Sequence, residues 1–261
     1  MVNFFVIIVL YNKRLEESVA YSSLKAAANH CVSRVSFLIA DNSTNEEIKS
    51  SNRDSSTILE YFDMHGNKGL PAAYNQAIDR IDKTTDNWIV ISDQDTKYES
   101  EYFNKLEDTV KSCDSKAIAP QVTNSRGLMS PFTLKHDCFP GINRFINSGL
   151  AVRSDVFHKI KYNEELFLDF VDYDLANEFH KNGIDVNFIN AELFQDFSGT
   201  DFTNKEAAIK RYEIYIKDAD KYYTKWEPSS FNRSYYVKKR TLNLSWKFRT
   251  TDFIKLYRKR N

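Results

Sequence analysis

The sequence predicts an α/β protein whose sheet is mostly parallel and carries helices on both faces. Two observations lead to this prediction. Strand-like apolar runs alternate with helical apolar spacing over residues 1–122, and the strongest of these runs are apolar throughout, without polar residues at every second position. Alternating strands and helices are typical of parallel sheets, and continuous apolar runs suit strands that are buried on both faces.

The first expected elements are a strand, a helix and a second strand. Residues 4–10 form the longest apolar run, and its β-branched side chains favour a strand. Apolar residues recur at helical spacing over 15–30, and an apolar run at 35–40 predicts the next strand. Thr44 and Glu47 have the spacing of a capping box, which predicts the start of a short helix.

The same order continues to residue 122. Strands are expected at 57–62, 88–91 and 117–122, where short apolar runs lie between polar clusters. Helices are expected between them, because apolar residues share one helical face at 70–81 and again at 102–110. Beyond residue 125 the alternation loosens. There we expect short strands at 128–132, 144–146 and 149–152, a helix at 172–181, a strand at 184–189 and a helix at 207–223.

The composition excludes several classes of protein. With 261 residues, of which 42% are hydrophobic and 28% charged, the chain has enough apolar side chains for a sizeable core. Its 36 basic and 36 acidic residues cancel, which argues against a nucleic-acid binder. No apolar run approaches the ~20 residues that span a bilayer, and none resembles a signal peptide. Three widely spaced cysteines indicate a reduced, cytoplasmic chain.

The basic residues are concentrated at the C-terminus. Residues 233–261 contain ten Lys or Arg and one acidic residue, a net charge of +9, so the remainder carries −9. Aromatic and aliphatic residues are interleaved with the basic ones, which predicts an amphipathic helical tail over 226–261. Such a tail suits an anionic membrane surface. The alternatives are packing of its aromatic side chains on the domain or, less favoured, nucleic-acid binding, and a homodimer interface is compatible with the first two.

Polar residues follow three expected strands at the point where each strand ends. These clusters are Tyr11-Asn12, Asp41-Asn42 and Asp93-Gln94-Asp95. Because ligands of open α/β sheets bind at the carboxyl ends of the strands, we expect the three clusters to converge on one crevice.

The strongest of these clusters contains Asp93 and Asp95. Two carboxylates one residue apart at a strand end can hold Mg²⁺, which typically takes one or two carboxylates and fills its other positions with water and phosphate oxygens. The cation would neutralise charge on a diphosphate leaving group. The alternative is a solvated turn in which an acidic side chain caps a helix, since Thr96 and Glu99 have capping spacing.

A second acidic segment, residues 169–174, contains three aspartates in an apolar and aromatic context. Apolar surroundings raise the pKa of a carboxyl group and make it a competent general base. The alternative is that Asp172 or Asp174 caps a helix or complements its dipole. A third segment, 67–75, is a small-residue loop that enters a helix and could present N–H groups to an anion.

Other catalytic motifs are missing from the sequence. It has no Walker loop, no Gly-x-Gly-x-x-Gly and no Gly-x-Ser-x-Gly elbow, and its five histidines lack metal-ligand spacing.

Taken in order, the motifs resemble an inverting glycosyltransferase of family 2 with the Rossmann-like GT-A fold. The matching segments are 6–12, 39–43, 67–69 with Asn75, 93–96, 147–149 and 167–175. The Asp-Gln-Asp and Phe-Leu-Asp-Phe-Val-Asp sequences are most similar to the rhamnosyltransferase-like branch. The resemblance covers residues 3–200 and implies a GT-A domain over 1–225, with a nucleotide-sugar-binding half (1–122), an acceptor-binding half (123–225) and the tail beyond.

The resemblance implies a role for each matching residue. Asp172 is expected to be the catalytic base, and Asp95 with Asp93 to bind Mn²⁺ or Mg²⁺. The residues expected to contact the donor are Leu10, Tyr11, Asn12, Asp41, Asn67, Gly69, Asn75, Asp93 and Gln94. Those expected to contact or position the acceptor are Ser148, Gly149, Asp169 and Asp174.

One position departs from the family pattern. The family often places a histidine ligand near the end of the strand after the catalytic helix, and this sequence has Gln195 there. Glutamine is a poorer Mn²⁺ ligand than histidine, so metal dependence is open. Asp196 could substitute.

The function implied is transfer of L-rhamnose from dTDP-rhamnose to a saccharide acceptor, carried on polyprenyl diphosphate at the inner face of the cytoplasmic membrane, in bacterial cell-surface polysaccharide synthesis. The alternatives within this class are UDP-galactofuranose, UDP-galactose or UDP-glucose as donor. Two alternatives lie outside the glycosyltransferases. One is a catalytically inactive binding module, which Gln195 would support, and the other is a nucleotidyltransferase, which would release diphosphate from a nucleoside triphosphate.

Overall fold

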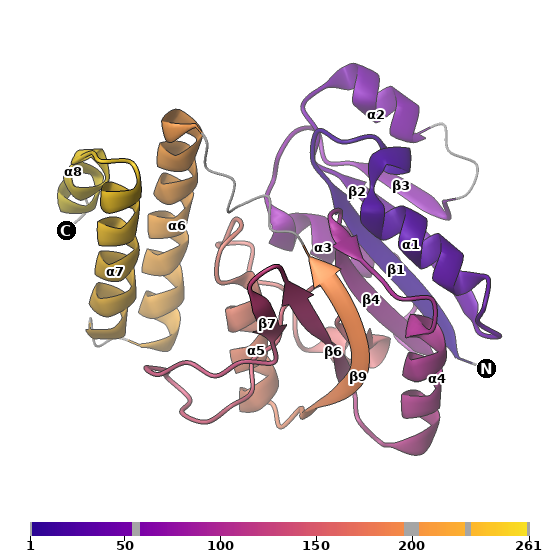
Figure 1. Ribbon diagram of the computed structural model, residues 1–261. Coiled ribbons are helices and arrows are strands. Elements are labelled where there is room, and N and C mark those ends of the chain that lie inside the picture. The colour runs from indigo at the N-terminus through magenta and orange to yellow at the C-terminus, as the bar shows by residue number, and fades with distance from the viewer. Residues whose placement is uncertain (1, 54–57, 196–203, 228–230, 260–261) are drawn as a thin grey trace.

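The computed structural model describes residues 2–53, 58–195, 204–227 and 231–259. Within them a nine-stranded mixed sheet is flanked by helices, and three further helices stand beside it at the C-terminal end (Figure 1). The α/β fold class predicted from the sequence is confirmed.

The first half of the chain builds the parallel part of the sheet. Strands β1 (Asn3–Leu10), β2 (Arg34–Asp41), β3 (Glu60–Asp63) and β4 (Asn87–Asp93) pair in the order β3-β2-β1-β4, all parallel. The helices of this half are η1 (Leu15–Glu17), α1 (Val19–Ala28), α2 (Glu46–Arg53), α3 (Leu70–Ile78) and α4 (Tyr102–Ser112).

The second half extends the sheet with mixed strands. These are β5 (Thr96–Lys97), β6 (Ala117–Asn124), β7 (Gly127–Ser130), β8 (Ala151–Arg153) and β9 (Val186–Gln195). Strand β8 is antiparallel to both β4 and β6 and joins the two halves, while β9 runs parallel to β6 and antiparallel to β5. The helices of this half are η2 (Ser154–His158) and α5 (Val171–Lys181).

Burial on both faces explains the continuous apolar run of β1. Ile7 and Val9 belong to one core cluster, and Val6 and Ile8 to a second one on the opposite face. Because successive strand side chains point to opposite faces, a strand with two buried faces needs apolar residues at every position.

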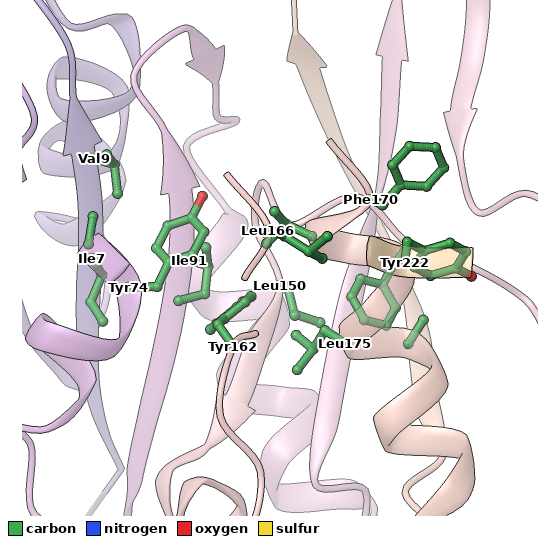
Figure 2. Close-up of a cluster of buried hydrophobic side chains, with 14 of the residues drawn as sticks. Ile7, Val9, Tyr74, Ile91, Leu150, Tyr162, Leu166, Phe170, Leu175 and Tyr222 are labelled. Carbon is green, nitrogen blue, oxygen red and sulfur yellow. The ribbon is translucent and has the colours of Figure 1, made fainter. Parts of the chain in front are cut away.

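The first of these clusters continues into the C-terminal helices (Figure 2). It runs from Val9 of β1 through Tyr74 of α3 and Ile91 of β4 to Leu175 of α5 and Tyr222 of the long helix α6 (Lys205–Trp226). The C-terminal helices therefore share the core of the sheet.

The tail is helical, as expected, and packs through one face. Helices α7 (Phe231–Lys247) and α8 (Asp252–Lys259) bury Val237, Leu244 and Phe253 in the same core cluster. The opposite face of α7 is exposed, with Trp246 at 86%. No helix among the described residues is long and apolar enough to cross a membrane.

Several local expectations were wrong. Asn45, not Thr44, caps α2, because its side-chain oxygen accepts the N–H groups of Glu47 (2.9 Å) and Ile48 (3.2 Å). The expected strand at 144–146 is a single bridge between Arg144 and Phe132. The spacing of Thr96 and Glu99 opens no helix, since Thr96 lies in the short strand β5, which the sequence analysis missed. The three cysteines are free, as expected.

Candidate functional site

The polar clusters after β1, β2 and β4 converge, as predicted. The backbone N–H of Tyr11 donates to the side-chain oxygen of Gln94 at 2.9 Å, and the N–H of Asn12 donates to the hydroxyl of Ser43 at 2.8 Å. The N–H of Asn42 donates to the carbonyl of Leu10 at 2.8 Å. The carboxyl ends of three neighbouring parallel strands therefore meet at one edge of the sheet.

Asp93, the last residue of β4, is the centre of the site. Its Oδ1 accepts the hydroxyl of Tyr74 at 3.1 Å, and its Oδ2 accepts the hydroxyl of Ser148 at 2.9 Å. Ser148 is fully buried and accepts in turn from the Thr96 hydroxyl at 3.0 Å. The structure thus brings the predicted residues Asp93 and Ser148 into direct contact, and it fixes the carboxylate from two sides.

Gln195, the last residue of β9, joins Asp93 to Asp95. Its Nε2 lies 3.1 Å from Asp93 Oδ2 and 3.3 Å from Asp95 Oδ1. The residue is 3% exposed, and its Oε1 is buried without a hydrogen-bond partner among the described residues. A buried acceptor that lacks a partner costs about 1–3 kcal/mol, so it indicates a ligand or a strained site.

The residues at this point fit a divalent cation. Burial and the charge of Asp93 raise the pKa of Asp95, so the pair would gain from a nearby positive charge. Two carboxylates plus phosphate oxygens are the ligand set that Mg²⁺ prefers. The described residues contain no group of three His, Cys, Asp or Glu able to hold a metal, so phosphate, amide or water oxygens would complete the set. Asp196, a possible further ligand, lies outside the described residues.

Asp172 lies in the first turn of α5. The N-cap position of this helix is occupied by Phe170, which has a φ of 63° and makes no side-chain hydrogen bond to the helix. The alternative that Asp172 or Asp174 is the N-cap residue was therefore wrong. The pKa of the Asp172 carboxyl is raised to about 7, mainly by burial and in smaller part by the charge of Asp93. A carboxylate with a pKa near the working pH suits a general base.

The other two aspartates of this segment are held by ion pairs. Asp169 pairs with Arg211 of α6 through both of its oxygens. Asp174 is 2% exposed, accepts from the indole N–H of Trp226 at 2.7 Å and from Lys225 at 3.1 Å, and forms an ion pair with Lys225. Asp172 makes no ion pair within the described residues, which sets it apart chemically from its neighbours.

Sequence reasoning missed Asp218, a buried residue of α6. Its carboxylate accepts the backbone N–H groups of three successive residues, at 3.0, 2.8 and 2.8 Å: Phe167, Leu168 and Asp169. A signal was available, because Asp218 stands among the buried side chains of α6, where an aspartate needs partners. It fixes the backbone that leads into Asp172.

The loop before α3 contacts the same segment. Gly69 has a φ of 88°, and a Cβ atom at this position would lie 2.7 Å from the carbonyl oxygen of Phe167. The N–H of Leu70 donates to that oxygen at 2.8 Å, and the side chain of Asn67 accepts from the N–H of Gly69 at 3.1 Å. The expected donor loop and the expected catalytic segment are thus in backbone contact.

Two expected donor residues have their side chains engaged inside the protein. Asp41 is fully buried and accepts from Asn52 at 2.7 Å and Tyr61 at 3.0 Å. Asn75 binds the backbone of Tyr162 and the carboxylate of Glu164. In this structure Asp41 fixes the end of β2, and Asn75 supports residues 162–164.

Gly149, an expected acceptor residue, begins the turn into β8. Its φ is 80°, and a Cβ atom would lie 2.5 Å from a methyl group of Leu193 and 2.7 Å from the ring of Pro120. Only glycine fits where the chain at residue 149 packs against Pro120 and Leu193. This packing positions the adjacent Ser148, whose hydroxyl donates to Asp93.

Residues 5–161, more than half of the chain, match the sequence profile of glycosyl transferase family 2. The chain belongs to this family. No curated protein matches this family 2 glycosyltransferase significantly in sequence. Among solved structures it is similar to residues 1–349 of S. aureus TarS, with a TM-score of 0.56 and 14% identity over 97% of this chain and 80% of that one.

Two further TarS structures show the same likeness. The complex of TarS with UDP has a TM-score of 0.57 and 14% identity, over 88% of this chain and 74% of that one. The complex with UDP-GlcNAc has a TM-score of 0.55 and 14% identity, over 97% of this chain and 81% of that one. At this identity the likeness establishes the fold. The family 2 glycosyltransferase therefore has a GT-A-like mixed sheet with flanking and C-terminal helices.

Proposed function

We propose that this family 2 glycosyltransferase inverts the anomeric centre of its donor sugar and uses Asp172 as the general base. The observation that carries the proposal is the difference among the three aspartates of one segment. Asp169 and Asp174 are neutralised by α6, whereas Asp172 has no ion pair within the described residues and a pKa raised to about 7 by burial. It is the carboxylate of the segment that can accept a proton.

The reaction follows from these groups. Asp172 accepts the proton of the acceptor hydroxyl while that oxygen bonds to the anomeric carbon. The bond from the anomeric carbon to the donor diphosphate breaks on the opposite face, and its electron pair leaves with the diphosphate. Asp93 and Asp95 would hold a divalent cation that neutralises this charge. Tyr74 and Ser148 keep the Asp93 carboxylate in place.

The Asp172→Asn variant tests this function. We expect turnover to fall roughly 10²- to 10⁴-fold, as for loss of a general base, while donor nucleotide binding stays unchanged. Asp155→Asn is a control, since Asp155 pairs with Arg153 at the far end of β8. An inactive binding module would lose nothing measurable with Asp172→Asn. Release of diphosphate from nucleoside triphosphates would favour the nucleotidyltransferase alternative.

The proposed donor is dTDP-rhamnose, on the strength of the Asp-Gln-Asp and Phe-Leu-Asp-Phe-Val-Asp motifs. UDP-GlcNAc is a second candidate, because TarS, which shares the fold, has been crystallised with UDP and with UDP-GlcNAc. Thermal unfolding with dTDP, UDP and GDP separates them. A nucleotide at 100 times its dissociation constant stabilises by about 2.7 kcal/mol, and the base that stabilises most identifies the donor.

The proposed acceptor is a saccharide on a polyprenyl diphosphate in the cytoplasmic membrane, and the support is the exposed face of α7. This face, which we name the α7 stripe, carries apolar residues exposed by 63%, 61% and 86% and basic residues between them: Phe231, Tyr235, Lys238, Lys239, Leu242 and Trp246. The helix contains no acidic residue. Exposed aromatic and basic side chains on one helical face match an anionic bilayer surface.

Helix α7 also contacts the proposed catalytic segment, through a residue outside the α7 stripe. Arg240 of α7 approaches Asp169 to 3.7 Å, and its guanidinium lies 4.0 Å from the centre of the Tyr215 ring. The inward face of α7 therefore contacts the residues that precede Asp172, while the α7 stripe is the face left exposed.

Sedimentation with vesicles tests the membrane proposal. We expect the chain to pellet with phosphatidylglycerol vesicles and not with phosphatidylcholine vesicles, and less so at high salt. The double variant Leu242→Ser/Trp246→Ser should stay in solution, whereas Leu128→Ser, a 58% exposed residue on β7, should behave as the wild type. Equal pelleting of the double variant would contradict the proposal, as would a wild type that dimerises through α7 without binding vesicles.

A further inference from the structure

Among the described residues of the site, Gln195 is the one side chain with a buried polar atom that lacks a hydrogen-bond partner. It is nine-tenths or more buried, its amide is aimed at the Asp93 and Asp95 carboxylates, and its Oε1 has no partner among the described residues. We propose that Gln195 is a ligand of the donor-site cation through its side-chain oxygen, and that the resulting all-oxygen site accepts Mg²⁺ as well as Mn²⁺. This inference rests on the proposed function, since it assumes a nucleotide donor.

The spacing of the three side chains supports coordination. In an octahedral site with bonds of about 2.0–2.1 Å, neighbouring ligand atoms lie about 2.9 Å apart. The terminal amide atom of Gln195 that faces the carboxylates lies 3.1 Å from Asp93 Oδ2 and 3.3 Å from Asp95 Oδ1. An oxygen at that position would need only small shifts to become a neighbour of both carboxylates around one ion.

The amide can present its oxygen at little cost. Two carboxylates without a cation attract the NH₂ group, so Nε2 faces them and Oε1 faces away. A half-turn of the amide exchanges the two atoms, which have nearly the same shape. Because Oε1 has no hydrogen-bond partner among the described residues, the turn breaks no bond to it and exchanges one unpartnered buried group for another, while a cation between the carboxylates replaces the two bonds of Nε2.

The ligand type determines the choice of metal. Amide and carboxylate oxygens are hard ligands that suit Mg²⁺, whereas an imidazole nitrogen at the same place favours Mn²⁺, Co²⁺ and Zn²⁺. The five histidines do not enter the site: His65, His136 and His158 have partners elsewhere, and His30 and His180 lie at the ends of α1 and α5. The glutamine therefore makes the site discriminate little between Mg²⁺ and Mn²⁺.

The test measures metal-dependent nucleotide binding, with no turnover. Thermal unfolding is followed with UDP or dTDP in EDTA, in MgCl₂ and in MnCl₂, for the wild type, Gln195→His and Gln195→Leu. We expect similar stabilisation of the wild type by nucleotide with either metal. Gln195→His should bind nucleotide at least 10-fold more tightly with Mn²⁺ than with Mg²⁺, and Gln195→Leu should lose at least 10-fold with both. Gln121→His, on the exposed side of β6, is the matched control.

Each outcome decides the proposal. Nucleotide binding that is strongest in EDTA would overturn it, because the Gln195 NH₂ group would then replace the cation. Metal-dependent binding that is unchanged in Gln195→Leu would overturn it too. If Gln195→Leu does not fold, Gln195→Glu replaces it as the test. An added carboxylate should strengthen nucleotide binding with both metals if residue 195 is a ligand. Binding of no nucleotide under any condition would instead contradict the proposed function, and Mn²⁺ binding to the protein alone, measured by electron paramagnetic resonance, would still test Gln195.

Discussion

The carboxylate of Asp218 accepts the backbone N–H of Leu168 at 2.8 Å, which ties α6 to the segment that contains the proposed base. Asp218 also accepts the N–H groups of the residues on either side of Leu168. Helix α6 also forms ion pairs with Asp169 and Asp174, so it contacts the segment on both sides of Phe170. Helix α6 thus fixes the segment that contains the proposed base.

We expect Asp218→Asn to weaken both stability and turnover. An amide has one oxygen in place of two and carries no charge, so at least one of the three buried N–H groups would lose its partner at a cost of about 1–3 kcal/mol. The free energy of unfolding, measured by urea denaturation, should fall by this amount, and kcat should fall more than KM rises. Asp220→Asn is the control. Asp220 also lies on α6 but is less buried than Asp218 and pairs with Arg233, so its replacement should change neither the free energy of unfolding nor kcat by much.

Local patterns in the sequence were enough to predict most of the strands, the order of the elements and the meeting of three strand ends. They depend on apolar runs and on topology, which are encoded within short stretches. Asp218 and the amide bridge of Gln195 were not predictable in this way, because their partners lie about 50 and 100 residues away. Thr44 and Asn45 show a smaller limit, since both are good capping residues and their backbone geometry decides between them.

The pH dependence of turnover should reflect Asp172. The pKa of its carboxyl is raised to about 7 by burial, so below pH 7 the base is increasingly protonated and cannot accept the acceptor's proton. We expect kcat/KM to fall about tenfold for each pH unit below this pKa and to level off above it. A profile that stays flat from pH 5 to pH 8 would contradict the assignment of Asp172 as the base.

The stability of the apoprotein should show the opposite trend. The folded-state pKa of Asp172 lies above the value of about 4 in an unfolded chain, so the folded state binds this proton more tightly. The contribution of Asp172 to stability is therefore fully present below pH 4 and is lost as pH rises to about 7. Asp172→Asn removes the penalty of the buried charge, so its Tm should exceed that of the wild type at pH 8 and match it near pH 4.

Gly69 and Gly66 offer a matched pair for testing the contact between the loop before α3 and the catalytic segment. Both have positive φ values, 88° and 102°, so an alanine is strained at either position, by about 1–3 kcal/mol. Only Gly69 would place its new Cβ against the carbonyl oxygen of Phe167, at 2.7 Å, while nothing lies within 4 Å of the Cβ at Gly66.

Both alanine variants should therefore lose stability, but only Gly69→Ala should push the backbone of Phe167 away from the N–H of Leu70 and shift the segment that leads to Asp172. We expect Gly66→Ala to keep wild-type kcat after correction for the folded fraction, and Gly69→Ala to lose at least tenfold. Equal kcat losses in the two variants would mean that backbone strain in the loop, and not its contact with Phe167, limits turnover.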